Sequence, residues 1–204
     1  MPLDVEQIRW RLPQRDVVWF DRIDSTMPEA ARLAAAGAPA GTLVLAEEQT
    51  AGQGRHGRSW YSERGSGLYV SIVLRPAVEA DSMPVLTLAL GLAAQEAIAS
   101  VTGVLCEMRW PNDLLAHGRK CAGILCQTAD SAVVAGIGIN VNHDVFPAEL
   151  SELATSLRMM TGRLHSREDL LIELAASADK YCKLLEERGA DQVLHLYAER
   201  ARRG

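Results

Sequence analysis

The chain has 204 residues, of which 48% are hydrophobic and 23% are charged, and its net charge is -5 at pH 7. This composition is ordinary for a globular domain with one sizeable core, and the acidic balance argues against a broad nucleic-acid-binding surface. The four cysteines have no C-x-x-C spacing, which argues against a structural zinc. Because no stretch resembles a signal peptide or a membrane span, we expect a cytoplasmic protein.

Helices and strands can be predicted in chain order from apolar patterns, capping residues and glycine or proline breaks. The patterns predict a strand at 17–20, a helix at 26–37, strands at 42–47 and 67–74, a helix at 81–103, a strand at 104–110, a hairpin at 113–127, a strand at 132–141, and helices from there on. Consecutive strands joined by hairpins, with helices at intervals, indicate a mixed α+β domain and not a regular βαβ alternation.

Three of these elements carry recognisable end signals. The first helix begins with a capping residue, Thr26, and has Glu29 three residues later. The hairpin is expected to turn at His-Gly-Arg, residues 117–119. Ser166 is expected to cap a long C-terminal helix that ends at Gly189.

The segment AGQGRHGRSW, residues 51–60, contains the pattern G-x-G-x-x-G at Gly52, Gly54 and Gly57. In a dinucleotide-binding site this pattern leads into a helix whose N-terminus faces the pyrophosphate. Here two more glycines follow, and then the strand at 67–74, which leaves no room for a helix. The pattern therefore does not predict a dinucleotide site.

The same loop still has the composition of an anion-binding site. Its glycines allow backbone N–H groups to approach an anion closely. Arg55 and Arg58 add charged donors that suit carboxylate and phosphate groups, and Trp60 offers a flat face for a ring such as adenine. The alternative is a solvated basic hairpin without a ligand.

Two further motifs combine charged and amide side chains with turns. The stretch RWPND places Arg109, Asn112 and a carboxylate around a proline turn, and it leads to Lys120 in the hairpin. A lysine flanked by core residues can point inward, where it needs an anionic partner; the alternative is a surface lysine at the hairpin end. The glycines of GIGINVN indicate close approach of a backbone or a ligand, and Asn140 follows them, with simple turn chemistry as its alternative role.

Taken together, these motifs resemble the catalytic domain of biotin protein ligases. The resemblance covers residues 17–200, and the matching segments follow the order and spacing of the family: AEEQTAGQGRHGRSWYS, GLYVSIVLRP, RWPNDLL, GRKCAGILCQ and GIGINVN. As a set they are far more specific than a single glycine pattern. The resemblance implies a mixed β-sheet flanked by helices, related to class II aminoacyl-tRNA synthetases and lipoate ligases.

The resemblance also implies a ligase reaction in two steps. Biotin and ATP, with Mg²⁺ bound through ligands that stay unknown, would give biotinyl-5′-adenylate and pyrophosphate. The biotinyl group would then pass to a lysine of the biotin carboxyl carrier protein or domain of an acetyl-CoA-type carboxylase. Neither DNA nor a membrane is expected as a partner. Ligases of this fold often pair through sheet edges, which leaves a homodimer open.

Roles for particular residues follow from the same resemblance. Lys120 and Arg55 match the catalytic positions, where their charges would bring the biotin carboxylate and the ATP α-phosphate together. The loop at 52–58 would fold over the adenylate and exclude water. The implied biotin-binding residues are Ser25, Thr26, Gln49, Gly52, Gln53, Gly54, Arg55 and Lys120. The implied ATP-binding residues are Arg58, Trp60, Arg109, Asn112 and Asn140.

The sequence departs from the family pattern at two positions and in length. Where this chain has Arg109, the family often has lysine, and where it has Gln53, the family often has arginine. Both differences bear on ATP affinity. Residues 1–204 are expected to form the catalytic domain alone, without the small C-terminal SH3-like β-barrel domain and without an N-terminal helix-turn-helix. Two other functions stay open: a biotin- or adenylate-binding domain with poor turnover, and a lipoate or octanoate ligase of the same fold.

Overall fold

A computed structural model of the protein describes residues 2–77 and 83–201. The strands are β1 (Val17–Phe20), β2 (Leu43–Ala46), β3 (Gly67–Leu74), β4 (Glu107–Arg109), β5 (Asp113–Ala116), β6 (Arg119–Ala129) and β7 (Ala132–Asn140). The helices are α1 (Val5–Arg11), α2 (Thr26–Ala35), α3 (Met83–Thr102), α4 (Leu157–Thr161), α5 (Arg167–Arg188) and α6 (Ala190–Ala201), together with a 3-10 turn, η1 (Arg55–Gly57).

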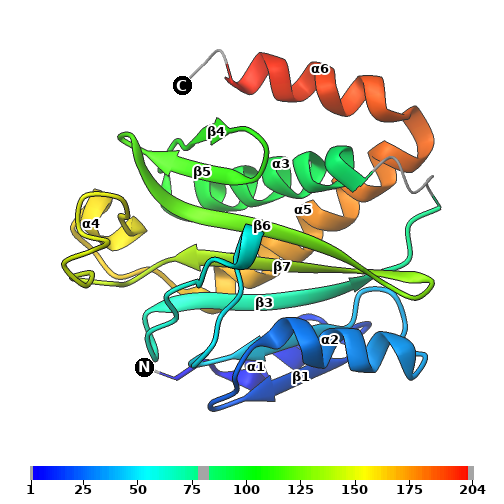
Figure 1. The fold of residues 1–204 in the computed structure, drawn as a ribbon, viewed down its shortest axis with the longest axis horizontal. Helices are drawn as coiled ribbons and strands as arrows, with labels where there is room; N and C mark the ends of the chain where they lie inside the picture. The colour runs from blue at the N-terminus through cyan, green and yellow to red at the C-terminus, as the bar shows by residue number, and fades with distance from the viewer. Residues whose placement is uncertain (1, 78–82, 202–204) are drawn as a thin grey trace.

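All of these strands join one seven-stranded sheet in the order β1-β2-β3-β7-β6-β5-β4 (Figure 1). The pair β1–β2 is parallel, and each other neighbouring pair is antiparallel. The hairpin β5–β6 turns at His117 and Gly118, which both take positive φ angles, as a two-residue hairpin turn requires. The mixed α+β fold and the hairpin are thus confirmed.

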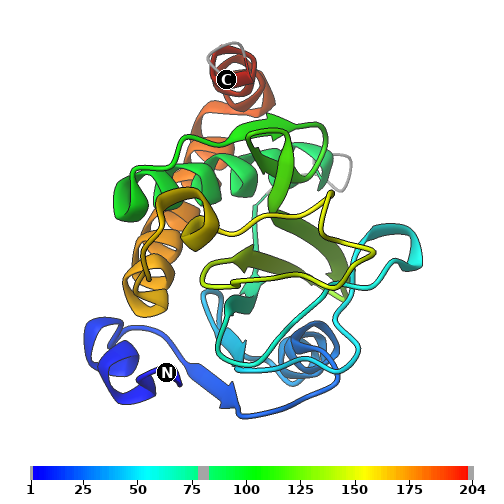
Figure 2. The same cartoon turned by 90° about the vertical axis from the view of Figure 1, so that its left-hand side faces the viewer.

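The two faces of the sheet are covered differently (Figures 1 and 2). One face packs against α3 and α5, and the larger core lies there, with Leu90 and Leu174 from the helices and Ile137 from β7. On the other face α2 places Met27 against Val134 and its neighbours in a smaller core. The loop that contains η1 covers the rest of that second face, in front of β6 and β7.

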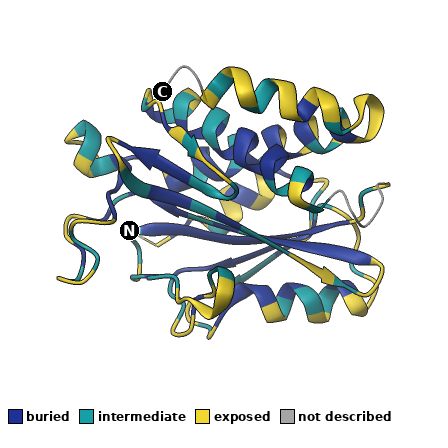
Figure 3. Cartoon of the chain, turned by 45° about the horizontal axis from the view of Figure 1, so that its top comes forward, coloured by how far each residue is buried: buried dark blue, intermediate teal, exposed yellow. Residues whose placement is uncertain are grey.

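Because side chains alternate along each strand, the two faces of the sheet carry different residues. Successive strand residues point to opposite sides, so Ile137 and Ile139 join the large core while Gly136 and Gly138 face α2 and the loop. Figure 3 shows the strands buried along most of their length, whereas α5 and α6 expose their outer sides. At Gly136 and Gly138, β7 therefore has no side-chain volume of its own on the second face.

The structure confirms that α2 begins at Thr26 but corrects the predicted capping residue. Ser25, and not Thr26, is the N-cap, and its Oγ accepts a hydrogen bond of 3.3 Å from the N–H of Met27. Thr26 is the first helical residue, and its hydroxyl lies 2.8 Å from Ser71 Oγ. The prediction was wrong by one residue because both residue types can cap, and only the tertiary contact with β3 selects between them.

Other element boundaries also differ from the predictions. The strand predicted at 104–110 is limited to Glu107–Arg109, and the described residues 142–156 contain no helix. Helix α1 was not predicted; Asp4 caps it by accepting a hydrogen bond from the N–H of Gln7. The predicted helix start at 81–82 lies outside the described residues. Ser166 caps α5 as predicted, at 3.0 Å from the N–H of Asp169.

Helix α3 is long and apolar enough to cross a membrane, with a mean hydropathy of 1.5. However, 61% of its most apolar window is buried inside the protein, where it packs against α5 and the sheet. Such burial is typical of the core helix of a globular protein.

Candidate functional site

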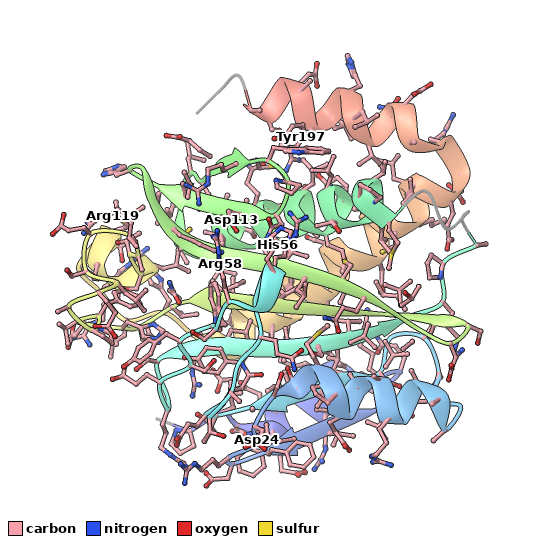
Figure 4. The ribbon with its side chains drawn as sticks, viewed as in Figure 1. Asp24, His56, Arg58, Asp113, Arg119 and Tyr197 are labelled. Atoms are coloured by element: carbon pink, nitrogen blue, oxygen red, sulfur yellow. The ribbon has the colours of Figure 1, made fainter. Side chains whose placement is uncertain are left out.

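The loop between β2 and β3 forms a short hairpin over the glycine-rich part of the sheet. Gln53 and Ser59 close it by an antiparallel bridge, and the N–H of Trp60 donates to the carbonyl of Gly52 at 2.8 Å. Residues 56–59 at its tip are exposed, as expected for a solvated basic hairpin. Both ends nevertheless return to the sheet, and Arg58 stands on the exposed side of the loop (Figure 4).

The ring of Trp60 lies directly on the glycines of β6 and β7. A Cβ atom on Gly138 would lie 2.4 Å from Trp60 Cε2, and one on Gly123 would lie 3.1 Å from Cζ3. Only glycine allows this approach, which explains the glycines predicted to mark a close contact. The indole Nε1 is buried and, within the described part of the chain, has no hydrogen-bond partner. It is a donor that a bound ligand could satisfy.

Lys120 lies between this ring and a carboxylate. Its Nζ is 2.7 Å from Asp113 Oδ1 and 5.2 Å from the centroid of the Trp60 ring, and 30% of its side chain is exposed. The interpretation of Lys120 as an inward-pointing cation with an anionic partner is thereby confirmed, and that of a surface lysine is not. Asp113 was not predicted as a site residue, although its position in RWPND, after Arg109, was a visible signal.

Asp113 joins two cations. Besides Lys120, its Oδ2 accepts a hydrogen bond from Arg109 Nη2 at 2.7 Å. Burial raises the pKa of Asp113, but the hydrogen bonds from Lys120 and Arg109 outweigh it and hold the pKa below the usual value. The carboxylate is therefore ionised at neutral pH and orients both cations.

The backbone of Lys120 is held from the other side by residues that follow β7. Its N–H donates to the carbonyl of Leu153 at 2.8 Å, and its carbonyl accepts from the N–H of Thr155 at 3.0 Å. Asn140 Nδ2 donates to the carbonyls of Lys120 and Thr155, at 3.3 and 3.1 Å. Asn140 thus supports the strand that carries the lysine.

Arg55 reaches the site from the loop. Its Nη1 donates to Asn112 Oδ1 at 3.2 Å, and Asn112 Nδ2 donates to the carbonyl of Ile124 in β6 at 3.2 Å. The predicted residues Arg55, Asn112 and Lys120 are therefore brought together, and the five-residue turn RWPND supplies the side-chain partners of both cations.

The opposite end of the site is polar and uncharged. Gln49 Oε1 accepts from the N–H of Thr26 at 2.9 Å, and Gln49 Nε2 donates to Ser62 Oγ at 2.8 Å. Ser25 and Thr26 are both buried. Ser62 and Ser71 complete this network and were not predicted; the signal for Ser71 is a lone hydroxyl in the apolar strand GLYVSIVL.

A small cavity connects the two ends. Its volume is about 50 Å³, and its lining includes nine predicted residues: Ser25, Thr26, Gln49, Gln53, Gly54, Arg55, Trp60, Asn112 and Lys120. Apolar residues form the middle of the wall, among them Met27 of α2 and Leu125 of β6, neither of which was predicted. This volume is smaller than the range of about 300–1,000 Å³ that is usual for small-molecule pockets.

Four predicted site residues do not line this cavity. Gly52 is buried where a Cβ atom would lie 2.5 Å from the carbonyl oxygen of Trp60, so it allows the loop to fold. Arg58 is exposed, Arg109 is bound to Asp113, and Asn140 lies behind Lys120. Gly52 stays a prediction as a biotin-binding residue, and Arg58, Arg109 and Asn140 stay predictions as ATP-binding residues.

The described residues contain no group of three or more His, Cys, Asp or Glu side chains that could hold a metal ion. The donors near the cavity are cations and neutral amides, which suit anions. A magnesium ion at such a site would be held mainly by phosphate oxygens of a nucleotide and by water, as is usual for Mg²⁺.

Comparisons with known proteins show the family of this chain. The model of the biotin/lipoate A/B protein ligase family matches residues 19–144. The chain belongs to this family. It is 39% identical over 171 residues to the bifunctional ligase/repressor BirA of Bacillus spizizenii, covering 80% of this chain and 53% of that protein. It is 33% identical over 192 residues to the biotin--[acetyl-CoA-carboxylase] ligase of Paracoccus denitrificans, covering 89% and 79%.

Solved structures of family members share the fold. The biotin protein ligase of Aquifex aeolicus in complex with biotin and ATP matches with a TM-score of 0.82 and 31% identity, over 89% of this chain and 76% of that one. The chain spans about half the length of the Bacillus relatives that it matches. The seven-stranded sheet flanked by helices is the ligase fold expected from the sequence.

Proposed function

We propose that this domain forms biotinyl-5′-adenylate from biotin and ATP and then transfers the biotinyl group to a lysine of a carrier protein. One observation carries the proposal: a single cavity has a neutral polar end and a cationic end, joined by an apolar wall. Biotin has the same order of groups, with a ureido ring, an aliphatic chain and a carboxylate.

The polar end suits a ureido group, which presents one carbonyl and two N–H groups. Thr26 and Ser25 supply hydroxyls, and Gln49 supplies an amide. Because these groups are buried, a ligand that satisfies their hydrogen bonds is favoured over one that leaves them unpaired. Octanoate, which has only an aliphatic tail, would leave them unpaired.

The cationic end suits the meeting of two anions. A carboxylate and the ATP α-phosphate repel one another in a pocket shielded from water unless cations lie beside both. Lys120 lines the cavity and forms an ion pair with Asp113. The biotin carboxylate would become a second partner of Lys120, with Arg55 beside the phosphate. The carboxylate oxygen would then attack the α-phosphorus, and the bond to pyrophosphate would break.

The second step needs an amine that reaches the adenylate. A carrier lysine would attack the acyl carbon, forming an amide and releasing AMP. The names of relatives from Mycobacterium tuberculosis and Paracoccus denitrificans, biotin--[acetyl-CoA-carboxylase] ligases, support the carrier of such a carboxylase as the partner. Magnesium, when bound with ATP, would neutralise charge on the phosphates.

Substrate entry requires the loop to move. Pockets for small molecules usually measure about 300–1,000 Å³, and this cavity measures about 50 Å³. Trp60 and Arg55, which line it, belong to the loop whose tip is exposed. Opening this hairpin would admit biotin, and closing it over the adenylate would exclude water.

The test is ATP–pyrophosphate exchange, measured with biotin and, in parallel, with octanoate. The proposal predicts exchange with biotin and little with octanoate. Exchange with octanoate alone would favour a lipoate or octanoate ligase, which the family also includes. Tight binding of biotin without exchange would favour a binding domain with poor turnover.

A further inference from the structure

Two thiols lie in contact behind the catalytic lysine proposed above. The Sγ atoms of Cys106, just before β4, and Cys121, in β6, are 3.5 Å apart, and Cys121 directly follows Lys120. Both cysteines are buried in the large core, on the face of the sheet that packs against α3. Neither sulfur has a part in the proposed reaction.

A cavity at the surface reaches one member of this pair, Cys106. It has a volume of about 560 Å³, and Cys106 lines it together with Ala99 and Ser100 of α3 and with Leu105. The side chain of Leu105 is 82% exposed. A small apolar group can therefore reach Cys106 without passing through the active site.

The distance between the sulfurs suits a bridging atom. The two thiols lie 3.5 Å apart, at the distance of a thiol–thiol hydrogen bond. A disulfide bond measures about 2.05 Å, so oxidation would require the sulfurs to approach by about 1.5 Å. A single thiophilic atom with two bonds of about 2.3 Å to sulfur, at an angle of about 100–110°, holds the sulfurs about 3.5–3.8 Å apart and would leave them close to their present positions.

The burial of the two thiols favours a ligand whose bound form is neutral. Structural zinc needs four ligands, and the described residues offer no cluster of three or more metal-binding side chains. The hydrogen bond with Cys106 and burial both raise the pKa of the Cys121 thiol well above its usual value, so a charged product is disfavoured here. Trivalent arsenic bound to two sulfurs and one carbon is neutral and needs no further ligand.

We propose that Cys106 and Cys121 form a dithiol site for monosubstituted trivalent arsenicals, with the organic substituent in the adjacent cavity. With phenylarsine oxide, both S–H bonds break and two As–S bonds form. The oxide oxygen leaves as water with the two thiol hydrogens, and arsenic stays trivalent. This site is independent of the proposed ligase activity and lies on the opposite face of the sheet.

The test is intact-mass spectrometry of the folded protein with one equivalent of phenylarsine oxide, followed by thiol titration after denaturation. We expect one phenylarsenic group per chain and a fall from the four thiols of the sequence to two. A dithiol such as dimercaptopropanol should remove the group, and a monothiol at the same concentration should not. Cys106→Ala and Cys121→Ala should each abolish stable uptake, whereas the matched controls Cys126→Ala and Cys182→Ala should keep it.

Unchanged uptake in both Cys106→Ala and Cys121→Ala would overturn the proposal. So would four free thiols in the wild-type protein at excess reagent. If the core variants fail to fold, peptide mapping of the labelled wild-type protein decides the question. A bridge between the peptides that contain Cys106 and Cys121 supports the site, and arsenic bound at Cys126 or Cys182 contradicts it.

Discussion

The face of the sheet under α3 and α5 is filled by aliphatic side chains such as Leu90 and Ile137, whereas the face under the loop carries Gly123 and Gly138. On the first face the strands supply the volume that packs. On the second face, beside the smaller core under α2, glycines leave room on the strands, and Trp60 of the loop and Lys120 of β6 lie against them. The same strands therefore border both a packed core and a pocket, because successive residues point to opposite sides.

The largest effect is expected from the charge at the centre of the second face. Lys120→Ala removes the cation that would hold the biotin carboxylate, and we expect biotin-dependent pyrophosphate exchange to fall by about 10²–10³-fold. Arg119→Ala is the matched control, because Arg119 is the neighbouring cation of β6 and does not line the cavity. Equal exchange rates in the two variants would contradict the role of Lys120.

A substitution on the face under α3 and α5 should lower the stability of the fold without changing substrate binding. Leu90 is fully buried against the sheet, and Leu90→Ala is expected to lower the free energy of unfolding by about 2–5 kcal/mol. Urea unfolding measures this loss. The KM values for biotin and ATP should stay within a factor of two at temperatures where the variant is folded; a large rise in either KM would show that the two faces are coupled.

The glycines of the second face can be compared with one another. A Cβ atom at Gly138 meets the rigid Trp60 ring, whereas one at Gly136 meets Met27 Sδ at 2.5 Å, at a flexible side chain. We expect Gly138→Ala to raise the KM for ATP about tenfold, which corresponds to about 1.4 kcal/mol, and Gly136→Ala to have a smaller effect. The opposite ranking would mean that Trp60 is not a nucleotide platform.

The neutral end of the pocket can be tested by removing one hydroxyl. Thr26→Val keeps the shape of the side chain but leaves the hydrogen bonds with Ser71 and Gln49 unmade, and we expect biotin to bind about tenfold more weakly. Thr42→Val is the control, since Thr42 is also buried but donates to the carbonyl of Pro39, away from the cavity. Calorimetric titration with biotin should detect no change in the control.

The smallest effect concerns the ion pairs that attach α6. Burial alone would raise the pKa of Glu96, but hydrogen bonds from Lys180, Tyr181 and Arg200 lower it to about 2. A carboxylate with a depressed pKa stabilises the fold above its unfolded pKa and loses this contribution as the pH falls through the folded value. Because the group is partly exposed, we expect Glu96→Gln to cost only about 1 kcal/mol at pH 7. The difference in unfolding free energy should shrink as the pH falls from about 4.5 toward 2; a difference that grows would be contrary to this assignment.

The sequence predicted the charged and amide side chains of the site better than the residues that hold them in place. Arg55, Lys120 and Asn112 could be found because glycines and a proline turn mark their segments. Asp113 and Ser71 were missed, since their roles depend on the register of β5 and β3 against neighbouring strands. The α2 cap was misplaced for a similar reason, because either neighbouring hydroxyl satisfies the local pattern.

The most direct measurement is a single turnover with excess protein, biotin and ATP labelled at the α-phosphate. The products are separated after acid quench, for the wild-type protein and Lys120→Ala. The account predicts biotin-dependent formation of labelled biotinyl-5′-adenylate by the wild-type protein, with a large loss in the variant and none in Arg119→Ala. Absence of labelled adenylate in folded wild-type protein that binds both substrates would contradict it.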